Sequence, residues 1–198
     1  MKINTYKVQI YGRVQGVGFR PFIFHLTKTN NLVVSVSNNA NGVIIYINTS
    51  KEKANLFVNQ ILTEKPEVSI ITDHTIEEVS CVKYDNFNII PSENKQQINI
   101  PITPDFAVCI ACKEEIKDKN KRRYNYAFTT CVHYSPRYAI TTKFPFEREN
   151  TTLSEFKMCT DCNDEYINPN NKRFHSQTNS CKKCGITLQL VDNYGKTV

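Results

Sequence analysis

The cysteines of this 198-residue chain follow a spacing that repeats. Cys81 stands alone, and the other seven cysteines lie between Cys109 and Cys184. Six of the seven form two matching sets, each member recurring fifty residues later: Cys109, Cys112 and Cys131, then Cys159, Cys162 and Cys181. Arg123-Tyr124 recurs as Arg173-Phe174 with the same offset. A fixed offset of this kind predicts a duplicated structural unit.

The second unit offers a complete set of metal ligands. Two C-x-x-C pairs, Cys159 with Cys162 and Cys181 with Cys184, are separated by eighteen residues. Four thiolates in this arrangement suit tetrahedral Zn²⁺ and leave no coordination position open for chemistry. Metal binding would supply much of the folding free energy of so polar a segment. We therefore predict a structural zinc site on these four cysteines.

The first unit lacks one ligand, because Tyr134 stands where the fourth cysteine would be. His133 could supply a nitrogen instead, which gives a favoured ligand set of Cys109, Cys112, Cys131 and His133. The alternatives are a water molecule in the fourth position, weak zinc binding, or no zinc. The sequence also leaves open whether each unit binds its own metal or the two units exchange cysteine pairs.

Regular hydrophobic patterning stops near residue 90, and Pro101 and Pro104 follow closely. We expect a first domain over residues 1–91, a linker over 92–106, a tandem zinc domain over 107–186, and over 187–198 the start of a linker to further domains. No stretch has the length of a signal peptide or of a membrane span. A cytoplasmic protein without a membrane partner is therefore expected, where thiols stay reduced.

The first domain shows alternating strand and helix patterns. Apolar residues alternate between Tyr6 and Ile10, Pro21 begins a helical pattern, and Ser50 is a plausible helix N-cap. The predicted elements are a strand at 6–10, a helix from 21 to 30, strands at 33–36 and 43–47 around a turn at 37–42, a helix from 51 to 62, and strands at 76–83 and 87–90. The order βαββαβ predicts an α+β, ferredoxin-like sandwich.

The loop between the first strand and the first helix is built to bind an anion. Gly16 and Gly18 can adopt positive φ, so successive backbone N–H groups can converge on one point. Pro21 suits the first turn of a helix, whose positive dipole end would face the same point. Arg20 adds a guanidinium, and phosphate is the natural ligand.

The stretch GRVQGVGFRPF, together with Asn38 in SNNANGV, resembles the signature of the acylphosphatase family. The resemblance implies that Arg20 fixes a phosphoryl group and that Asn38 orients the attacking water. The implied phosphate-binding residues are Gln15, Gly16, Val17, Gly18, Phe19 and Arg20. An acyl phosphate loses a carboxylate that needs no protonation, so binding and a positioned water suffice for hydrolysis. Neither stretch places a nucleophile beside a base.

An acylphosphatase-like domain followed by two such cysteine units resembles the amino-terminal part of the HypF family, the carbamoyltransferases of nickel–iron hydrogenase maturation. RRYNYAFTTCVHYSPRY and NKRFHSQTNSCKKCG are very like that family's zinc segments, although Tyr134 departs from them. The resemblance implies that the first domain hydrolyses carbamoyl phosphate. Carbamate would then pass to ATP-dependent domains, which are not in this sequence, for transfer to the partner protein HypE.

Two alternatives remain from the sequence alone. One is a stand-alone acylphosphatase whose zinc units dock another protein. The other is a zinc-ribbon protein that binds nucleic acid, since residues 107–185 carry a net charge of +5 out of the chain's +6. Acidic residues interrupt this basic segment and no nucleic-acid motif is present, so nucleic acid is not expected. His175 is expected at the surface, and Cys81 as a small buried residue.

Overall fold

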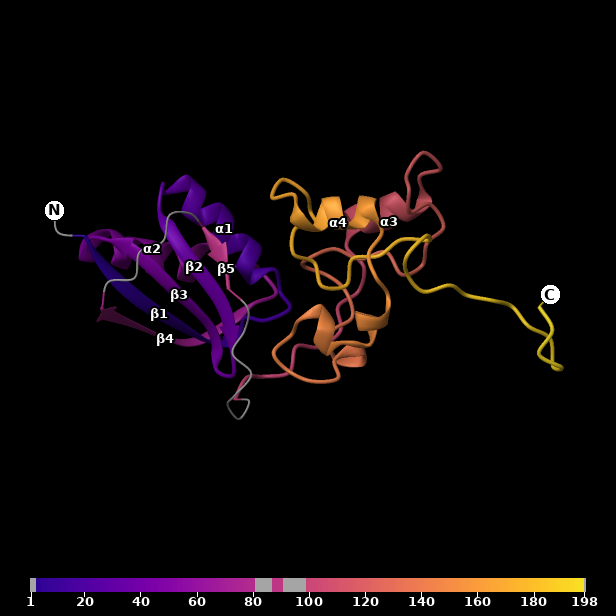
Figure 1. Ribbon diagram of the computed structural model, residues 1–198, viewed down its shortest axis with the longest axis horizontal. Coiled ribbons are helices and arrows are strands. Elements are labelled where there is room, and N and C mark those ends of the chain that lie inside the picture. Colours follow the sequence, from indigo (N-terminus) through magenta and orange to yellow (C-terminus); the bar gives the residue numbers. More distant parts are fainter. Residues whose placement is uncertain (1–2, 81–86, 91–98, 198) are drawn as a thin grey trace.

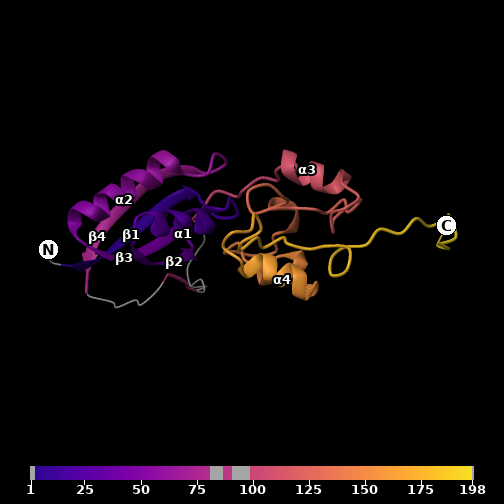
Figure 2. The ribbon, with the colours of Figure 1, turned by 90° about the horizontal axis from the view of Figure 1, so that it is seen from above.

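The computed structural model describes residues 3–80, 87–90 and 99–197 of the chain. Figure 1 shows two bodies side by side, a sheet with its helices at the amino-terminal end and a cysteine-rich region beyond it. The last residues extend away from both bodies (Figures 1 and 2). The expectation for Cys81, the end of the strand predicted at 76–83, and residues 92–98 of the predicted linker lie outside the described residues.

The first body has the predicted order of strands and helices, and one pair of its strands is parallel. Its elements are β1 (Asn4–Arg13), α1 (Phe19–Thr29), β2 (Val33–Asn39), β3 (Gly42–Thr49), α2 (Lys51–Glu64), β4 (Ile70–Val79) and β5 (Asn88–Ile89). The strand order in the sheet is β4-β1-β3-β2-β5. β5 pairs parallel with β2 and the other pairs are antiparallel, so the sheet is mixed rather than purely antiparallel. The α+β, ferredoxin-like prediction is confirmed.

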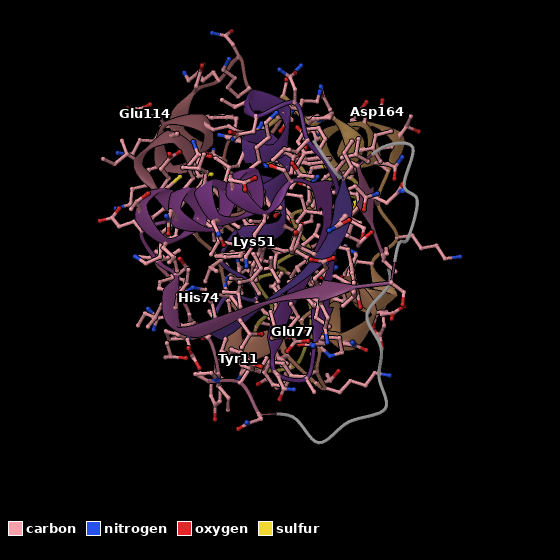
Figure 3. The ribbon with its side chains drawn as sticks, turned by 90° about the vertical axis from the view of Figure 1, so that its left-hand side faces the viewer. Tyr11, Lys51, His74, Glu77, Glu114 and Asp164 are labelled. Carbon is pink, nitrogen blue, oxygen red and sulfur yellow. The ribbon has the colours of Figure 1, made fainter. Side chains whose placement is uncertain are left out.

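The core lies between one face of the sheet and both helices. Alternate residues of β1 contribute to it, as their period of two requires. The same cluster holds Ile23 and Leu26 of α1 together with Phe57 and Ile61 of α2. Figure 3 views the end of the molecule remote from the cysteine-rich region, where the exposed Lys51, His74 and Glu77 project outward. The hydrophobic pattern of the sequence therefore locates the core correctly.

The structure moves the predicted starts of one helix and one strand. α1 begins at Phe19 rather than Pro21, because Gly18 at φ 76° is the N-cap and Pro21 falls in the first turn. β4 begins at Ile70, earlier than the predicted residue 76, because its pairing with β1 continues to Arg13. β4 is an edge strand with mostly exposed side chains, so its sequence carries little hydrophobic alternation.

The β2–β3 turn is tighter than predicted. β2 extends to Asn39 and β3 begins at Gly42, which leaves two residues at the tip instead of the predicted 37–42. Asn38 consequently belongs to β2 and pairs with Val43. A strand fixes the backbone of Asn38 more firmly than a loop would. Its side chain therefore has a defined direction relative to the neighbouring loop between β1 and α1.

The cysteine-rich region contains short helices. Two α-helices, α3 (Ile110–Lys117) and α4 (Thr160–Ile167), each begin directly after a cysteine N-cap, Cys109 or Cys159. Between them lie the 3₁₀ helices η1 (Tyr138–Ile140), η2 (Arg148–Asn150) and η3 (Thr152–Glu155). The equal lengths and equal starting points of α3 and α4 match the repeat in the sequence. Among the described residues, no helix is long and apolar enough to span a membrane.

Candidate functional site

The glycine loop has the conformation expected of an anion-binding loop. Gly16 has φ 70° and Gly18 has φ 76°, both in the left-handed region that favours glycine. Within the described part of the chain, no oxygen accepts a hydrogen bond from the backbone N–H groups of residues 16–19. These groups lead into the first turn of α1, where the helix dipole is positive. The loop can therefore offer several N–H donors to one anion.

Arg20 and Asn38 come together at this loop. Arg20 lies in the first turn of α1 and Asn38 in β2, and their side chains line one small cavity with Gly16 and Gly18. Only 9% of Arg20 and 2% of Asn38 are exposed. The cavity measures about 20 Å³. A guanidinium and an amide fixed beside unpaired backbone N–H groups form a compact set of hydrogen-bond donors that suits an anion.

Glu147, which the sequence analysis did not identify, completes this site from the cysteine-rich region. Nη1 of Arg20 lies 2.6 Å from Oε1 of Glu147, and Nη2 lies 3.1 Å from Oε2. Nδ2 of Asn38 donates to Oε1 of the same carboxylate over 3.4 Å. The side chain of Glu147 is 18% exposed. The sequence holds no signal for this contact, because no motif joins residues so far apart along the chain.

Residues that follow the first body in the chain also hold the outer side of the loop. Nε of Arg137 donates to the carbonyl of Gly16, and Thr103 Oγ1 donates to the carbonyl of Gln15 over 2.9 Å. The side chain of Gln15 donates to the carbonyls of Asn39 and Gly42 and accepts from the backbone N–H of Phe146. The Gln15 side chain thus joins the loop to its surroundings, which leaves its backbone as the part that can face phosphate.

His133 does not join the cysteines, which corrects the ligand set expected for the first unit. Among the described residues, the group of side chains in that unit that could hold a metal ion contains Cys109, Cys112 and Cys131 but not His133. The His133 ring lies instead against the glycine loop, since a Cβ added at Gly18 would be 2.8 Å from its Nδ1. The C-x-H spacing is one residue shorter than C-x-x-C, and the ring is directed toward the first body.

His175 is also placed differently from the expectation of a surface residue. It is half-buried, contacts the rings of Phe174 and Tyr166, and lines the same cavity as Arg20. Burial, together with the positive charge of Arg20, lowers the pKa of His175 to about 4. The ring is therefore neutral at pH 7 and can accept or donate a hydrogen bond beside the anion site.

A larger hollow adjoins the cavity on its outer side. This hollow measures about 510 Å³ and shares Arg20 and His175 with the cavity. Glu147 and Glu149 line the hollow as well. Arg20 and His175 therefore lie between an inner cavity and a more open space, and Glu147 contacts Arg20 on the open side.

The second unit has the geometry of a tetrahedral zinc site. The sulfur–sulfur distances are 3.7 Å for Cys159–Cys181, 3.8 Å for Cys181–Cys184 and 3.6 Å for Cys162–Cys184. Zn–S bonds of about 2.3 Å at tetrahedral angles place sulfurs about 3.8 Å apart. All four sulfurs lie within 4.8 Å of one another. The residues present are thus compatible with Zn²⁺.

The first unit gathers three cysteines in the same way. Sγ of Cys109 lies 3.8 Å from Sγ of Cys131, and Cys112 completes the group. Tyr134 contributes its backbone oxygen, which accepts from Cys131 Sγ over 3.8 Å. Both clusters are compatible with zinc, and the first provides one protein ligand fewer. Each cluster contains cysteines of one unit only, so the two units do not exchange cysteine pairs.

Ion pairs between arginines and glutamates connect the two units, whereas each cysteine cluster stays within one unit. Arg123 of the first unit contacts Glu165 of the second at 2.5 Å, and Arg173 of the second contacts Glu115 of the first at 2.8 Å. Nη2 of Arg123 also lies 3.5 Å from the sulfur of Cys162. The fifty-residue repeat therefore forms a reciprocal pair, and an arginine from one unit supports a thiolate ligand of the other.

Comparison with known proteins gives two family matches. The family described as Acylphosphatase matches residues 6–89. The family described as HypF finger matches residues 108–141 and 158–191, one match for each cysteine unit. The two matches correspond to the two bodies of the structure.

Individual relatives combine both parts. The chain is 42% identical over 146 residues to a probable carbamoyltransferase HypF of Methanocaldococcus jannaschii, covering 73% of this chain and 19% of the relative. It is 32% identical over 188 residues to the carbamoyltransferase HypF of Rhodobacter capsulatus, covering 95% and 25%. An acylphosphatase of Staphylococcus aureus is 33% identical over 72 residues, covering 36% of this chain and 81% of the relative.

A solved structure agrees with these matches. A crystal structure described as full-length HypF in the phosphate- and nucleotide-bound form superposes with a TM-score of 0.86 at 34% identity, covering 97% of this chain and 26% of that one. This chain thus spans about a fifth to a quarter of the length of the HypF relatives.

Proposed function

Because this chain belongs to the acylphosphatase family over residues 6–89 and to the HypF family as a whole, we propose that its first domain hydrolyses carbamoyl phosphate to carbamate and inorganic phosphate. The observation that carries the proposal is the convergence of Arg20, Asn38 and the glycine loop on one cavity. The solved HypF relative described as phosphate-bound supports a phosphoryl ligand for this family.

The loop would bind the phosphoryl group. The N–H groups of residues 16–19 face no protein acceptor in the described chain and can donate to the phosphoryl oxygens. Arg20 adds a guanidinium with five N–H groups, of which two face Glu147 in this structure. Fixed donors of this kind stabilise charge on the equatorial oxygens in the transition state.

Asn38 would place the attacking water. Its Nδ2 donates to Glu147, which leaves Oδ1 as an acceptor for a water O–H. The water oxygen then attacks phosphorus, the bond between phosphorus and the acyl oxygen breaks, and its electron pair remains on the carbamate. The proton lost by the water ends on the phosphate product. A carbamate leaves as an anion, so no general acid is required.

A covalent intermediate is not part of the proposal. The hydroxyl that lines the cavity, Ser176 Oγ, lies 3.5 Å from Thr178 Oγ1. The neighbouring imidazole of His175 packs against aromatic rings, and among the described residues it makes no hydrogen bond with that hydroxyl. A nucleophile would need a base within hydrogen-bonding reach. Direct attack by water is the simpler reaction for this arrangement.

Arg20→Ala and Asn38→Ala test this function. Phosphate release from carbamoyl phosphate is measured for the chain and both variants, with acetyl and benzoyl phosphate as comparison substrates. Loss of one positioned charged donor is expected to lower kcat/KM by about a hundredfold or more. Unchanged rates in Arg20→Ala, or no hydrolysis of any acyl phosphate by the unmodified chain, would remove the assignment.

The cysteine-rich region would bind zinc structurally. The second unit would hold Zn²⁺ on Cys159, Cys162, Cys181 and Cys184, and the first would hold it on Cys109, Cys112 and Cys131 with a non-protein fourth ligand. Bound zinc would lock each knuckle and so fix the positions of Arg137 and Glu147 at the phosphate loop. In the longer relatives, the carbamate would continue to ATP-dependent domains and to a HypE-like partner in the cytoplasm.

The structure removes part of the basic charge of the cysteine-rich region from contact with nucleic acid. Lysines and arginines both supply this charge, and several of the arginines are engaged within the protein. Arg123 and Arg173 pair with glutamates, and Arg137 and Arg148 donate to backbone carbonyls. Buried, engaged guanidinium groups are not available to a phosphate backbone.

A further inference from the structure

Glu147 already binds both side chains that the proposed reaction requires. Its carboxylate contacts Arg20 with two oxygens, at 2.6 and 3.1 Å, and accepts from Asn38 over 3.4 Å. The preceding residue, Phe146, is anchored to the loop through its N–H and the side chain of Gln15. A carboxylate on an anchored segment thus stands where an anionic ligand would meet the same donors.

The inner cavity has little room in this structure, and Glu147 engages two of its lining residues, Arg20 and Asn38, from the outer side. About 20 Å³ accommodates a single water, whereas a phosphoryl group brings three oxygens and a phosphorus. The outer hollow, about 510 Å³, is lined by Glu147 itself and by Arg148. Rotation of the Glu147 side chain into this hollow would clear the donors of Arg20 and Asn38 without moving either body.

We propose that Glu147 is an internal, displaceable ligand of the phosphoryl site. It holds Arg20 and Asn38 in their binding positions before substrate arrives, and it moves into the outer hollow when a phosphoryl group enters. The proposal rests on the proposed function and specifies its binding step. Glu147 is a positioning residue in this scheme, because it acts through Arg20 and Asn38.

Competition of this kind has a definite thermodynamic signature. Only the fraction of molecules with Glu147 displaced can bind a phosphoryl ligand, so every such ligand has its dissociation constant raised by the same factor. The chemical step proceeds from the displaced state and keeps its rate. Removing the competitor should therefore lower the KM of an acyl phosphate and the Kd of inorganic phosphate equally, with little change in kcat.

Glu147→Gln tests the proposal with a nearly isosteric side chain that lacks the charge. Binding of inorganic phosphate is measured by titration calorimetry, and hydrolysis of acetyl phosphate by phosphate release. Hydrogen bonds of a neutral amide are weaker than those of a carboxylate. We therefore expect the Kd of inorganic phosphate and the KM of acetyl phosphate each to fall by about tenfold. Glu149→Gln is the matched control, since Glu149 lines the same hollow, is exposed and has no recorded contact with Arg20 or Asn38. It should leave both constants within about twofold.

Further variants separate this role from others. Glu147→Asp, with a shorter carboxylate, should give intermediate constants, and in the Arg20→Ala background Glu147→Gln should have much less effect. Unchanged or weaker phosphate binding in Glu147→Gln would overturn the proposal, as would a tenfold fall in kcat, which would instead make Glu147 a catalytic base.

The phosphate titration also keeps the two proposals apart. Tighter phosphate binding by Glu147→Gln without any hydrolysis would support displacement and refute the hydrolase function. Hydrolysis that requires Arg20, together with equal phosphate affinity in the unmodified chain and in Glu147→Gln, would support the function and refute displacement.

Discussion

Nε of Arg137 donates a hydrogen bond to the carbonyl oxygen of Gly16, so an arginine of the cysteine-rich region fixes the glycine loop of the first body. Arg137 is buried, its other donors reach the carbonyls of Pro136 and Val132, and burial lowers its pKa to about 10. A carbonyl held on the outer side of the loop directs the neighbouring N–H groups toward the opposite side. The second body therefore helps to shape the anion site of the first.

Arg137→Lys should weaken phosphate binding by the loop. Lysine keeps the charge but loses the planar fork that reaches three carbonyls, so the Gly16 carbonyl is no longer held. We expect the KM for acyl phosphate to rise by about tenfold, which corresponds to about 1.4 kcal/mol, with a smaller change in kcat. Steady-state hydrolysis of acetyl phosphate measures both constants.

Arg148→Lys provides the control for this substitution. Arg148 is also an arginine of the cysteine-rich region that donates to backbone carbonyls, namely those of Gln177, Asn179 and Phe156, and none of them belongs to the loop. The control should lower thermal stability without a comparable rise in KM. Equal effects of the two substitutions on KM would show that Arg137 acts only through overall stability.

Tyr134→Cys should strengthen metal binding by the first unit. Position 134 is equivalent to Cys184 in the repeat, whose sulfur lies 3.8 Å from that of Cys181. A fourth thiolate would complete the ligand set and slow the loss of zinc to a chelator. In the unmodified chain, zinc should leave in two phases, the first unit before the second, and the variant should show a single slow phase. Metal content and release are followed with a chromogenic zinc chelator.

Tyr138→Cys is the matched control for the added thiol. Tyr138 is 66% exposed and lies in η1, outside both cysteine clusters. This variant should release zinc in two phases, as the unmodified chain does. A Tyr134→Cys variant that also kept its fast phase would contradict the equivalence of the two units.

The sequence predicts the elements of the first body and the cysteine cluster of the second unit well, because both depend on local patterns. Alternating apolar residues define the strands, Ser50 caps α2 by accepting from Lys53 N–H, and paired cysteines three residues apart converge into a cluster that could hold a metal ion. Asn38 was correctly associated with the loop, although its strand was expected to end earlier. The roles of Arg20 and Asn38 in catalysis stay predictions, as do the domain boundaries.

Contacts between the bodies could not be predicted in the same way. Glu147 and Arg137 reach the loop through tertiary packing, which leaves no periodic or spaced signal in the chain. His133 shows the reverse error, since its proximity in sequence to Cys131 suggested a ligand while its ring turns toward Gly18. Sequence spacing determines which residues can meet within one motif. It carries no information about which surfaces of two motifs face each other.

His175 should remain neutral well below the pH at which histidines usually titrate. Burial and the nearby charge of Arg20 lower its pKa to about 4, below the ordinary value of about 6.5. The unfolded chain therefore binds the proton more readily, so this contribution to stability is present above pH 6.5 and is lost as pH falls toward 4. Added inorganic phosphate should raise the pKa, because an anion at Arg20 offsets its charge.

Histidine ring resonances followed by NMR between pH 3.5 and 8 check this expectation at intervals of about half a unit. Comparison with His175→Gln identifies the His175 signal among the four histidines of the chain. A midpoint near 6.5 for that signal would contradict the burial of the ring beside Arg20. An unchanged midpoint on adding phosphate would place the anion elsewhere.

Glu165→Gln should destabilise the cysteine-rich region markedly. Burial raises the pKa of Glu165, but its hydrogen bonds and charge contacts with Arg123 and Arg122 outweigh that effect and lower the pKa to about 2. Replacing the carboxylate leaves Arg123, which is 1% exposed, without its closest charge partner. Breaking a buried ion pair on one side costs about 3 kcal/mol, and the remaining contact of Arg123 with Glu115 reduces this to about 2. Urea unfolding of the zinc-loaded chain at pH 7 measures the difference.

The pH dependence of that difference distinguishes an electrostatic cause from a packing defect. A carboxyl whose pKa is lowered on folding contributes stability above its unfolded value near 4.3, and this contribution is lost as pH falls toward 2. The gap between the unmodified chain and Glu165→Gln should therefore narrow below pH 4.5, even though acid weakens zinc binding in both. The exposed neighbour gives the control, since Asp164→Asn should change stability by less than about 0.5 kcal/mol. A gap that stayed constant with pH would show that the carboxylate charge does not hold the two units together.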